Sequence, residues 1–224
     1  MKPLVNCQLY TFVDAAYLGG RDPAELTRQL CDGGSDLVQL RAKGWGADRI
    51  LRLAEILNPL CQAAGVWFVV NDHPGIAQAV GAPLCHLGQE DFFDRGWTRA
   101  ADAFCGSIET GLGLSTHSAA QAERAQRAGP AYLAVGPVFA TPTKPGRPAV
   151  TLDYVRWASA RVRLPWFAIG GITEGNLESV LEAGARRVCV VSAILQAPDV
   201  TRACRRFRER LARVPLAADS GSND

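Results

Sequence analysis

The sequence predicts a single α/β domain that folds as a (β/α)8 barrel of the TIM type. Short apolar segments rich in β-forming residues alternate eight times with segments of helical periodicity. The apolar segments show little polar alternation, which is typical of parallel strands buried on both faces. No glycine fingerprint of a dinucleotide-binding sheet follows the first strand, and this absence favours a closed barrel over an open sheet.

The eight strands are expected at residues 7–13, 37–41, 67–72, 84–88, 111–115, 132–137, 166–172 and 188–192. The chain of 224 residues is long enough for one such barrel. We therefore expect one barrel domain over residues 1–215. Residues 216–224 are small and polar and are expected to be a disordered tail.

Several helices carry their own start signals. Asp22 is a candidate N-cap, followed by Pro23 at the first helical position and Glu25 at the third. Ser118 and Gln121 have the spacing of a capping box after the fifth strand. The connection at residues 90–106 is the least regular of the eight.

Two further helices are predicted from apolar periodicity. One is a long amphipathic helix over residues 50–64, which Pro59 should kink. The other is the last helix, whose apolar stripe consists of Val200, Ala203, Cys204, Phe207 and Leu211. Its arginines are expected to form a solvated face: Arg202, Arg205, Arg206, Arg208, Arg210 and Arg213.

Composition excludes several classes of partner. The net charge is +2 and no basic stripe is present, so we expect no nucleic-acid partner. No apolar stretch is long enough to span a membrane, and no secretory signal precedes the first strand. Seven scattered cysteines without a C-x-x-C spacing fit reduced thiols, several of them in the core, and a cytoplasmic location.

Polar residues recur at the carboxyl ends of the predicted strands, where the loops of a barrel share one mouth. The groups of interest are Gln39, Arg41, Lys43, Asn71, Asp72, His86, Asp91, Ser115, His117, Thr141, Thr143 and Lys144. Taken singly, Asn71-Asp72 could form an Asx turn, Asp91 could cap a helix, and Arg41 with Lys43 could be a solvated pair. Their convergence on one mouth favours an active site that binds phosphorylated small molecules.

Two kinds of phosphate-binding element are predicted at this mouth. Gly170-Gly171 allows a ligand to approach the backbone, and Val191-Ser192 leads into a short helix, as in many barrel phosphate sites. Asp72 and Asp91 stand near cationic residues and suggest Mg²⁺ bridging to phosphate oxygens. The alternative is that these carboxylates only form salt bridges with nearby lysines.

Two histidines are harder to assign from the sequence. His86 lies inside the fourth strand, where a hydrogen-bonded core histidine is the simpler interpretation. His117 lies nearer the mouth, and a loop role and a catalytic role remain equally open.

The ordered motifs resemble the thiamine-phosphate synthase (thiamine phosphate pyrophosphorylase) family. The resembling segments are residues 39–43, 70–72, 86–91, 113–118, 135–144, 168–172 and 190–194, and they span the chain from residue 9 to about 195. The resemblance implies a transferase that joins 4-amino-5-hydroxymethyl-2-methylpyrimidine diphosphate to a thiazole phosphate. The products are thiamine phosphate and diphosphate, and the mechanism is dissociative and assisted by magnesium.

The resemblance also implies roles for individual residues. Contacts to the pyrimidine diphosphate would come from Gln39, Arg41, Lys43, Asn71, Ser115 and Lys144. The thiazole phosphate would lie among Thr141, Thr143, Gly171, Val191 and Ser192. Asp72 and Asp91 would hold Mg²⁺, and Arg41, Lys43, Ser115 and Lys144 would act in catalysis.

Some features depart from the family pattern or leave other functions open. Ala42 and Gly44 stand where the family usually has acidic residues, which removes negative charge beside the diphosphate site. One alternative function is that of a thiazole tautomerase of the same superfamily. Another is a non-catalytic barrel that binds phosphate ligands. A homodimer is compatible with the sequence, which does not decide the oligomeric state.

Overall fold

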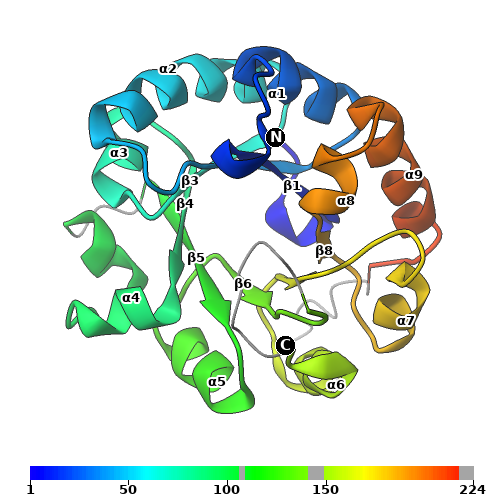
Figure 1. The fold of residues 1–224 in the computed structure, drawn as a ribbon. Coiled ribbons are helices and arrows are strands. Elements are labelled where there is room, and N and C mark those ends of the chain that lie inside the picture. The colour runs from blue at the N-terminus through cyan, green and yellow to red at the C-terminus, as the bar shows by residue number, and fades with distance from the viewer. Residues whose placement is uncertain (106–108, 141–148, 217–224) are drawn as a thin grey trace.

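The computed structural model describes residues 1–105, 109–140 and 149–216, and its strands form one closed barrel (Figure 1). The strands are parallel and follow one another in chain order. Leu9 and Tyr10 of the first strand pair with Val188 and Cys189 of the last, which closes the sheet. The predicted (β/α)8 barrel is therefore confirmed.

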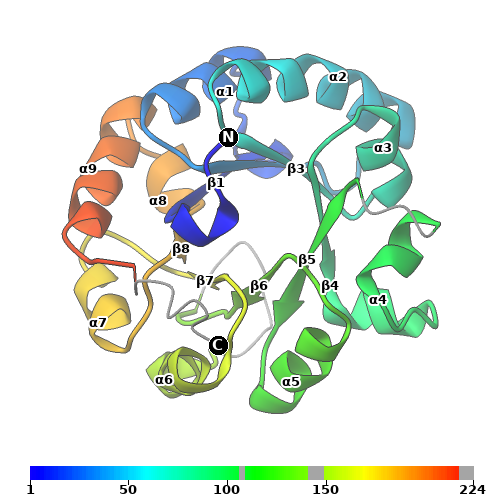
Figure 2. The same ribbon diagram turned by 180° about the vertical axis from the view of Figure 1, so that it is seen from behind.

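The strands of the barrel are β1 (Leu9–Asp14), β2 (Leu37–Arg41), β3 (Trp67–Asn71), β4 (Leu84–Gly88), β5 (Gly111–Thr116), β6 (Tyr132–Val135), β7 (Trp166–Ile169) and β8 (Val188–Cys189). The helices are α1 (Pro23–Asp32), α2 (Ala47–Ala63), α3 (Pro74–Ala79), α4 (Gln89–Asp94), α5 (Ala119–Arg127), α6 (Thr151–Arg161), α7 (Leu177–Glu182), α8 (Ser192–Leu195) and α9 (Val200–Ala212). Views from the two sides show the helices as a ring around the strands (Figures 1 and 2).

Several strands are shorter at their carboxyl ends than the sequence predicts. β7 stops at Ile169 because Gly170 and Gly171 adopt φ angles of 106° and 62°, which turn the chain out of the sheet. β3 stops one residue before Asp72, which has a φ of 65°. The residues that we expected in these strands but that follow the observed strand ends lie at the mouth of the barrel, where a ligand can reach them.

The predicted helix starts are found. Asp22 accepts a hydrogen bond from the backbone N–H of Ala24, and Pro23 is the first residue of α1. Ser118 caps α5 by accepting from Gln121, but the Gln121 side chain accepts from the backbone of His117 instead of closing a box on Ser118. α2 continues through Pro59.

The apolar stripe of α9 is buried as predicted, but the prediction of a solvated arginine face is partly wrong. Arg206 and Arg210 form ion pairs with Glu174 and Glu178 at 2.8 and 2.7 Å. Arg208 reaches 3.2 Å from the buried carboxylate of Asp36. These arginines therefore dock the last helix onto the barrel.

All seven cysteines are free thiols, as the sequence predicts, and the buried ones are Cys7, Cys61, Cys85, Cys189 and Cys204. Within the described part of the chain, no helix is both long and apolar enough to cross a membrane. Residues 217–224 of the predicted tail lie outside the described residues.

Aromatic side chains fill the barrel interior. Side chains two residues apart on a strand share a face, so Tyr10 and Phe12 both point inward from β1 and stack with ring centroids 5.4 Å apart. Tyr132 and Phe167 meet Tyr10 edge-on at 5.8 and 5.4 Å. This packed layer closes the interior and forms the floor on which the mouth of the barrel is built.

Candidate active site

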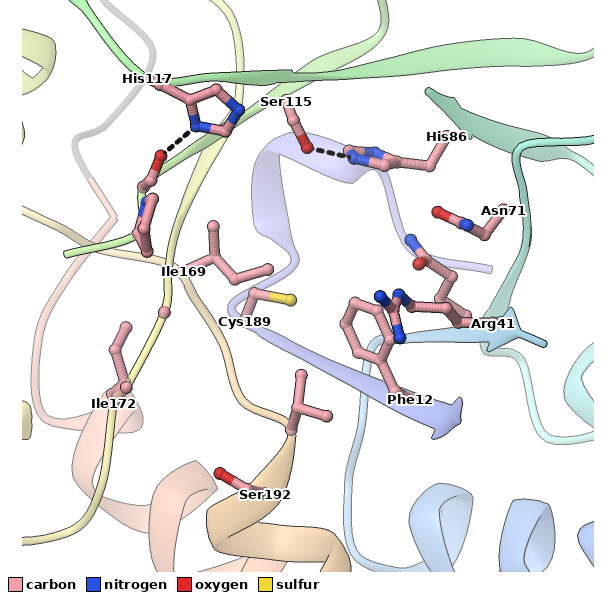
Figure 3. Close-up of a pocket in the computed structure, with 16 residues that line it drawn as sticks. Phe12, Arg41, Asn71, His86, Ser115, His117, Ile169, Ile172, Cys189 and Ser192 are labelled. Carbon is pink, nitrogen blue, oxygen red and sulfur yellow. Dashed lines mark hydrogen bonds between the residues drawn. The ribbon is translucent and has the colours of Figure 1, made fainter. Parts of the chain in front are cut away.

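One cavity brings together the ends of most of the strands (Figure 3). Its lining residues are Phe12, Gln39, Arg41, Asn71, His86, Ser115, His117, Gly136, Pro137, Ile169, Gly170, Gly171, Ile172, Cys189, Val191 and Ser192. Polar side chains from β2 to β5 occupy one part of it. Glycines and small side chains from β7, β8 and the start of α8 occupy the other.

Most of the residues singled out in the sequence lie in this cavity or directly beside it. Gln39, Arg41, Asn71, Ser115, Gly171, Val191 and Ser192 line the cavity itself. Lys43, Asp72 and Asp91 line an adjoining hollow, which shares Asn71 with the cavity. Thr141, Thr143 and Lys144 lie outside the described residues.

Arg41 is held by a buried carboxylate that we did not predict as part of the site. Its Nη1 lies 2.7 Å from Oδ2 of Asp14, and the Asp14 side chain is 1% exposed. The second carboxylate oxygen of Asp14 accepts from the backbone N–H of Ala16. The guanidinium is therefore fixed at the wall of the cavity instead of moving in solvent, and the alternative of a solvated pair with Lys43 is wrong for Arg41.

The adjoining hollow combines two carboxylates with two cationic side chains. Lys43 Nζ lies 3.6 Å from Oδ2 of Asp72. Asp91 stands in the first turn of α4, with its carboxylate folded back against Gly88. Arg95, at the end of the same helix, also lines the hollow.

This donor set fits a hard divalent cation that is shared with a phosphorylated ligand. Mg²⁺ uses one or two carboxylates and completes its coordination with water and phosphate oxygens, and Asp72 and Asp91 face the same hollow. Among residues 1–105, 109–140 and 149–216, no group of three or more His, Cys, Asp or Glu side chains could hold a metal by itself. The ion pair with Lys43 shows that the alternative interpretation, a salt bridge, also applies to Asp72.

Ala42 and Gly44, which we expect to depart from the family pattern, line the same hollow. Ala42 is buried, and Gly44 adopts a φ of 83°, a conformation that strains residues with a side chain. The structure therefore places uncharged residues on both sides of Lys43.

His86 is hydrogen-bonded, as the sequence suggests, but it also faces the cavity. Its Nδ1 lies 3.0 Å from the Tyr132 hydroxyl, and its Nε2 lies 2.8 Å from the Ser115 hydroxyl. His117 is bonded through Nδ1 to the carbonyl of Gly136 at the cavity wall (Figure 3). Both histidines are therefore anchored side chains of the site.

The glycine-rich wall depends on the absence of side chains. A Cβ on Gly170 would lie 2.5 Å from Pro137, and one on Gly171 would lie 2.6 Å from the carbonyl of Ala140. After these glycines, the Asn176 side chain accepts from the backbone of Thr173 and donates to the carbonyl of Gly171. The next helix, α7, starts at Leu177.

Sequence reasoning missed several residues of the site, including Asp14, Phe12, Cys189 and Arg95. Asp14 ends the first strand and so met the same criterion as the residues that were selected. Phe12 and Cys189 resemble ordinary core residues, and only barrel closure brings them to the cavity.

Comparison with known proteins finds relatives over most of the chain. Residues 9–194 match the model of the TMP-TENI family, described as thiamine monophosphate synthase. A thiamine-phosphate synthase of Thermus thermophilus is 51% identical over 186 residues, which cover 83% of this chain and 87% of the relative. One from Acidothermus cellulolyticus is 46% identical over 212 residues, 93% of this chain and 97% of the relative.

A solved structure shows the same fold over nearly the whole chain. The thiamine phosphate pyrophosphorylase of Pyrococcus furiosus superposes with a TM-score of 0.83 at 27% identity, covering 95% of this chain and 99% of that protein. Sequence and fold thus agree, and the chain belongs to the thiamine monophosphate synthase family, a family of transferases.

Proposed function

We propose that this protein joins 4-amino-5-hydroxymethyl-2-methylpyrimidine diphosphate to a thiazole phosphate, forming thiamine phosphate and releasing diphosphate. The observation that carries the proposal is the composition of the cavity. A cationic, amide-rich part and a glycine-rich part face one apolar space, as two phosphorylated substrates require. The names of the relatives support the same reaction.

The diphosphate would bind on the side of Arg41, Lys43 and Asn71. Breaking the carbon–oxygen bond places negative charge on the departing diphosphate, and fixed positive groups stabilise that charge. The ion pair with Asp14 holds Arg41 ready without reorganisation. Lys43 and Arg95 extend the cationic surface into the adjoining hollow. Lys144 is proposed to act at the same group, although it lies outside the described residues.

Asp72 and Asp91 would hold Mg²⁺ on the oxygens of the diphosphate. When bound, the ion adds positive charge where the leaving group becomes more negative. The two carboxylates provide only part of a coordination shell, which suits an ion that is completed by substrate oxygens and water.

The thiazole phosphate would bind at Gly171, Val191 and Ser192. The positive φ angles of Gly170 and Gly171 expose backbone to the cavity, and backbone N–H groups at such turns bind phosphate oxygens. Thr141 and Thr143 belong to the same proposal but lie outside the described residues.

The walls between the two ends support a dissociative order of steps. Phe12, Ile169 and Cys189 line this space with apolar surface. If the diphosphate leaves first, the pyrimidine carries positive charge until the thiazole nitrogen attacks its carbon. Apolar walls keep water away during that interval, so capture by the thiazole competes well with hydrolysis.

The test is product analysis with purified protein, both substrates and Mg²⁺. We expect thiamine phosphate and diphosphate in equal amounts. Isomerisation of the thiazole phosphate without coupling would replace our proposal with the tautomerase. Binding of either phosphate without any reaction would indicate a ligand-binding barrel.

A further inference from the structure

A continuous chain of buried hydrogen bonds crosses the barrel below the cavity. It runs from the Gln39 amide to the Tyr10 hydroxyl, and from there to the Tyr132 hydroxyl at 2.8 Å. Tyr132 bonds His86 Nδ1 at 3.0 Å, and His86 Nε2 bonds Ser115 at 2.8 Å. Gln39 and Ser115, the two ends of the chain, both line the cavity.

The interior members of the chain are held in place by packing. Tyr10 and Tyr132 are 1% and 0% exposed. Gly113 is the register partner of Tyr132 on the next strand, and a Cβ at Gly113 would overlap the tyrosine ring. Phe167 meets Tyr132 edge-on at 5.6 Å. The missing side chain at Gly113 is therefore the space that the phenol uses to reach His86.

The chemistry of the end group assigns a direction to every bond. The Gln39 nitrogen can only donate, so the Tyr10 oxygen accepts from it. The order that gives each phenol proton an acceptor then has Tyr10 donating to Tyr132, and Tyr132 donating to His86 Nδ1. Burial raises the pKa of both phenols well above the ordinary value, so both keep the protons that this order needs.

We infer that this chain fixes His86 as the neutral tautomer protonated on Nε2 and thereby makes the Ser115 hydroxyl a hydrogen-bond donor to the cavity. Because Nδ1 accepts from Tyr132, the ring proton sits on Nε2 and is donated to the Ser115 oxygen. The serine oxygen accepts from the ring, and its own proton is directed elsewhere. The Gln39 oxygen is likewise left to accept from a ligand.

Tyr10 and Tyr132 are therefore positioning residues, which act through His86 and Ser115. The catalytic consequence rests on the proposed function. There, the Ser115 proton would be donated to an oxygen of the departing diphosphate, as a preorganised donor that strengthens as charge develops. The opposite direction of the chain would make Ser115 an acceptor, which is unsuited to an anionic group.

The direction can be measured without substrate. Long-range ¹H–¹⁵N NMR spectra of the ligand-free protein distinguish the two imidazole tautomers. The protein has three histidines, so the spectra are simple to assign. We expect His86 to be protonated on Nε2, and Tyr132→Phe to lose that preference because phenylalanine has no proton to donate. Protonation of His86 on Nδ1 in the unsubstituted protein would overturn the inference, whatever reaction the enzyme catalyses.

Kinetics test the consequence for Ser115. Tyr132→Phe should lower kcat about 10-fold, in the range expected for losing an orienting hydrogen bond, with KM within about twofold. In a Ser115→Ala background the same substitution should have no further effect, because the group that it orients is gone. Equal effects in both backgrounds would contradict the positioning role.

Tyr154 provides the matched control. Its hydroxyl donates to Thr116 at 2.7 Å and is also largely buried, but it lies outside the chain that ends at Ser115. Tyr154→Phe should lower the melting temperature about as much as Tyr132→Phe and leave kcat unchanged. If both variants lose the same fraction of kcat, Tyr132 serves packing alone.

Discussion

Asp14 and Arg41 are register partners on neighbouring strands, and their side chains form a 2.7 Å ion pair at the cavity wall. The Asp14 side chain is 1% exposed and the Arg41 side chain is 11% exposed. At such a buried position, the partner of a charged group fixes where that group lies. Removing the partner is destabilising because the remaining charge is then buried and unpaired.

Asp14→Asn tests this pair. The substitution keeps an oxygen for the Ala16 N–H but removes the charge that holds Arg41. We expect the free energy of unfolding to fall by about 2–3 kcal/mol and kcat/KM for the pyrimidine diphosphate to fall about tenfold or more. Urea denaturation and steady-state kinetics measure the two effects.

Asp153→Asn is the control for that experiment. Asp153 also pairs with an arginine, Arg156, at 2.7 Å, but both side chains are exposed. Its loss should change stability by less than about 0.5 kcal/mol and leave kinetics unchanged. If Asp14→Asn behaves in the same way, Arg41 does not depend on its buried partner.

The proposed metal site predicts a change in magnesium dependence. Asp72→Asn and Asp91→Asn should each raise the Mg²⁺ concentration for half-maximal activity by about tenfold or more, because each removes a charged oxygen ligand. Calorimetric titration of Mg²⁺ with inorganic diphosphate present should show the same weakening. Asp94 is exposed at the end of α4, the helix that also carries Asp91, and Asp94→Asn should change neither the magnesium dependence of activity nor the calorimetric titration. Unchanged curves for both site variants would remove the metal assignment.

A substitution at Gly113 tests whether the Tyr132 ring needs the space that the missing side chain leaves. Gly113→Ala places a methyl group where the tyrosine ring lies, and overpacking of this kind costs about 1–3 kcal/mol. We also expect lower kcat in the folded variant, because Tyr132 must move away from His86. Gly75→Ala is the control: nothing lies within 4 Å of the added Cβ in α3, and stability should rise by about 0.4–1 kcal/mol. Wild-type stability of Gly113→Ala would show that the ring adapts easily.

Stability should decline at alkaline pH because buried thiols resist ionisation. Burial raises the pKa of the Cys204 thiol from 9.0 to about 12. The unfolded state therefore releases its proton first, and the stabilisation is complete below about pH 9 and is lost as the pH rises towards about 12. Each such group contributes a slope of about −1.4 kcal/mol per pH unit within this window.

Urea unfolding at several pH values between about 8 and 11 measures that slope. Cys204→Ala should make the decline of the unfolding free energy with pH shallower by the contribution of one proton. This holds whatever the substitution does to stability at neutral pH. Cys105→Ala, at an exposed position, should leave the slope as it is. An identical slope in the Cys204 and Cys105 variants would exclude Cys204 as a source of the alkaline loss.

The sequence by itself determined the features that depend on neighbours along the chain. Asp22 and Ser118 cap helices through atoms two or three residues away, so their effect could be read locally. The strand ends could be selected because a barrel places them all at one mouth, whatever their detailed packing. That rule was enough to select Gln39, Arg41 and Ser115, which line the cavity together.

Tertiary structure alone decided which partner each buried polar side chain bonds. Tyr10 meets Tyr132 across 122 residues of chain, Arg208 meets Asp36 across 172, and Asp14 meets Arg41 across 27. No local pattern predicts such pairs, because a tyrosine in an apolar strand looks like any core residue until the strand opposite is known. Closure of the barrel brings these side chains within bonding distance, and burial there leaves each polar group dependent on the partner it meets.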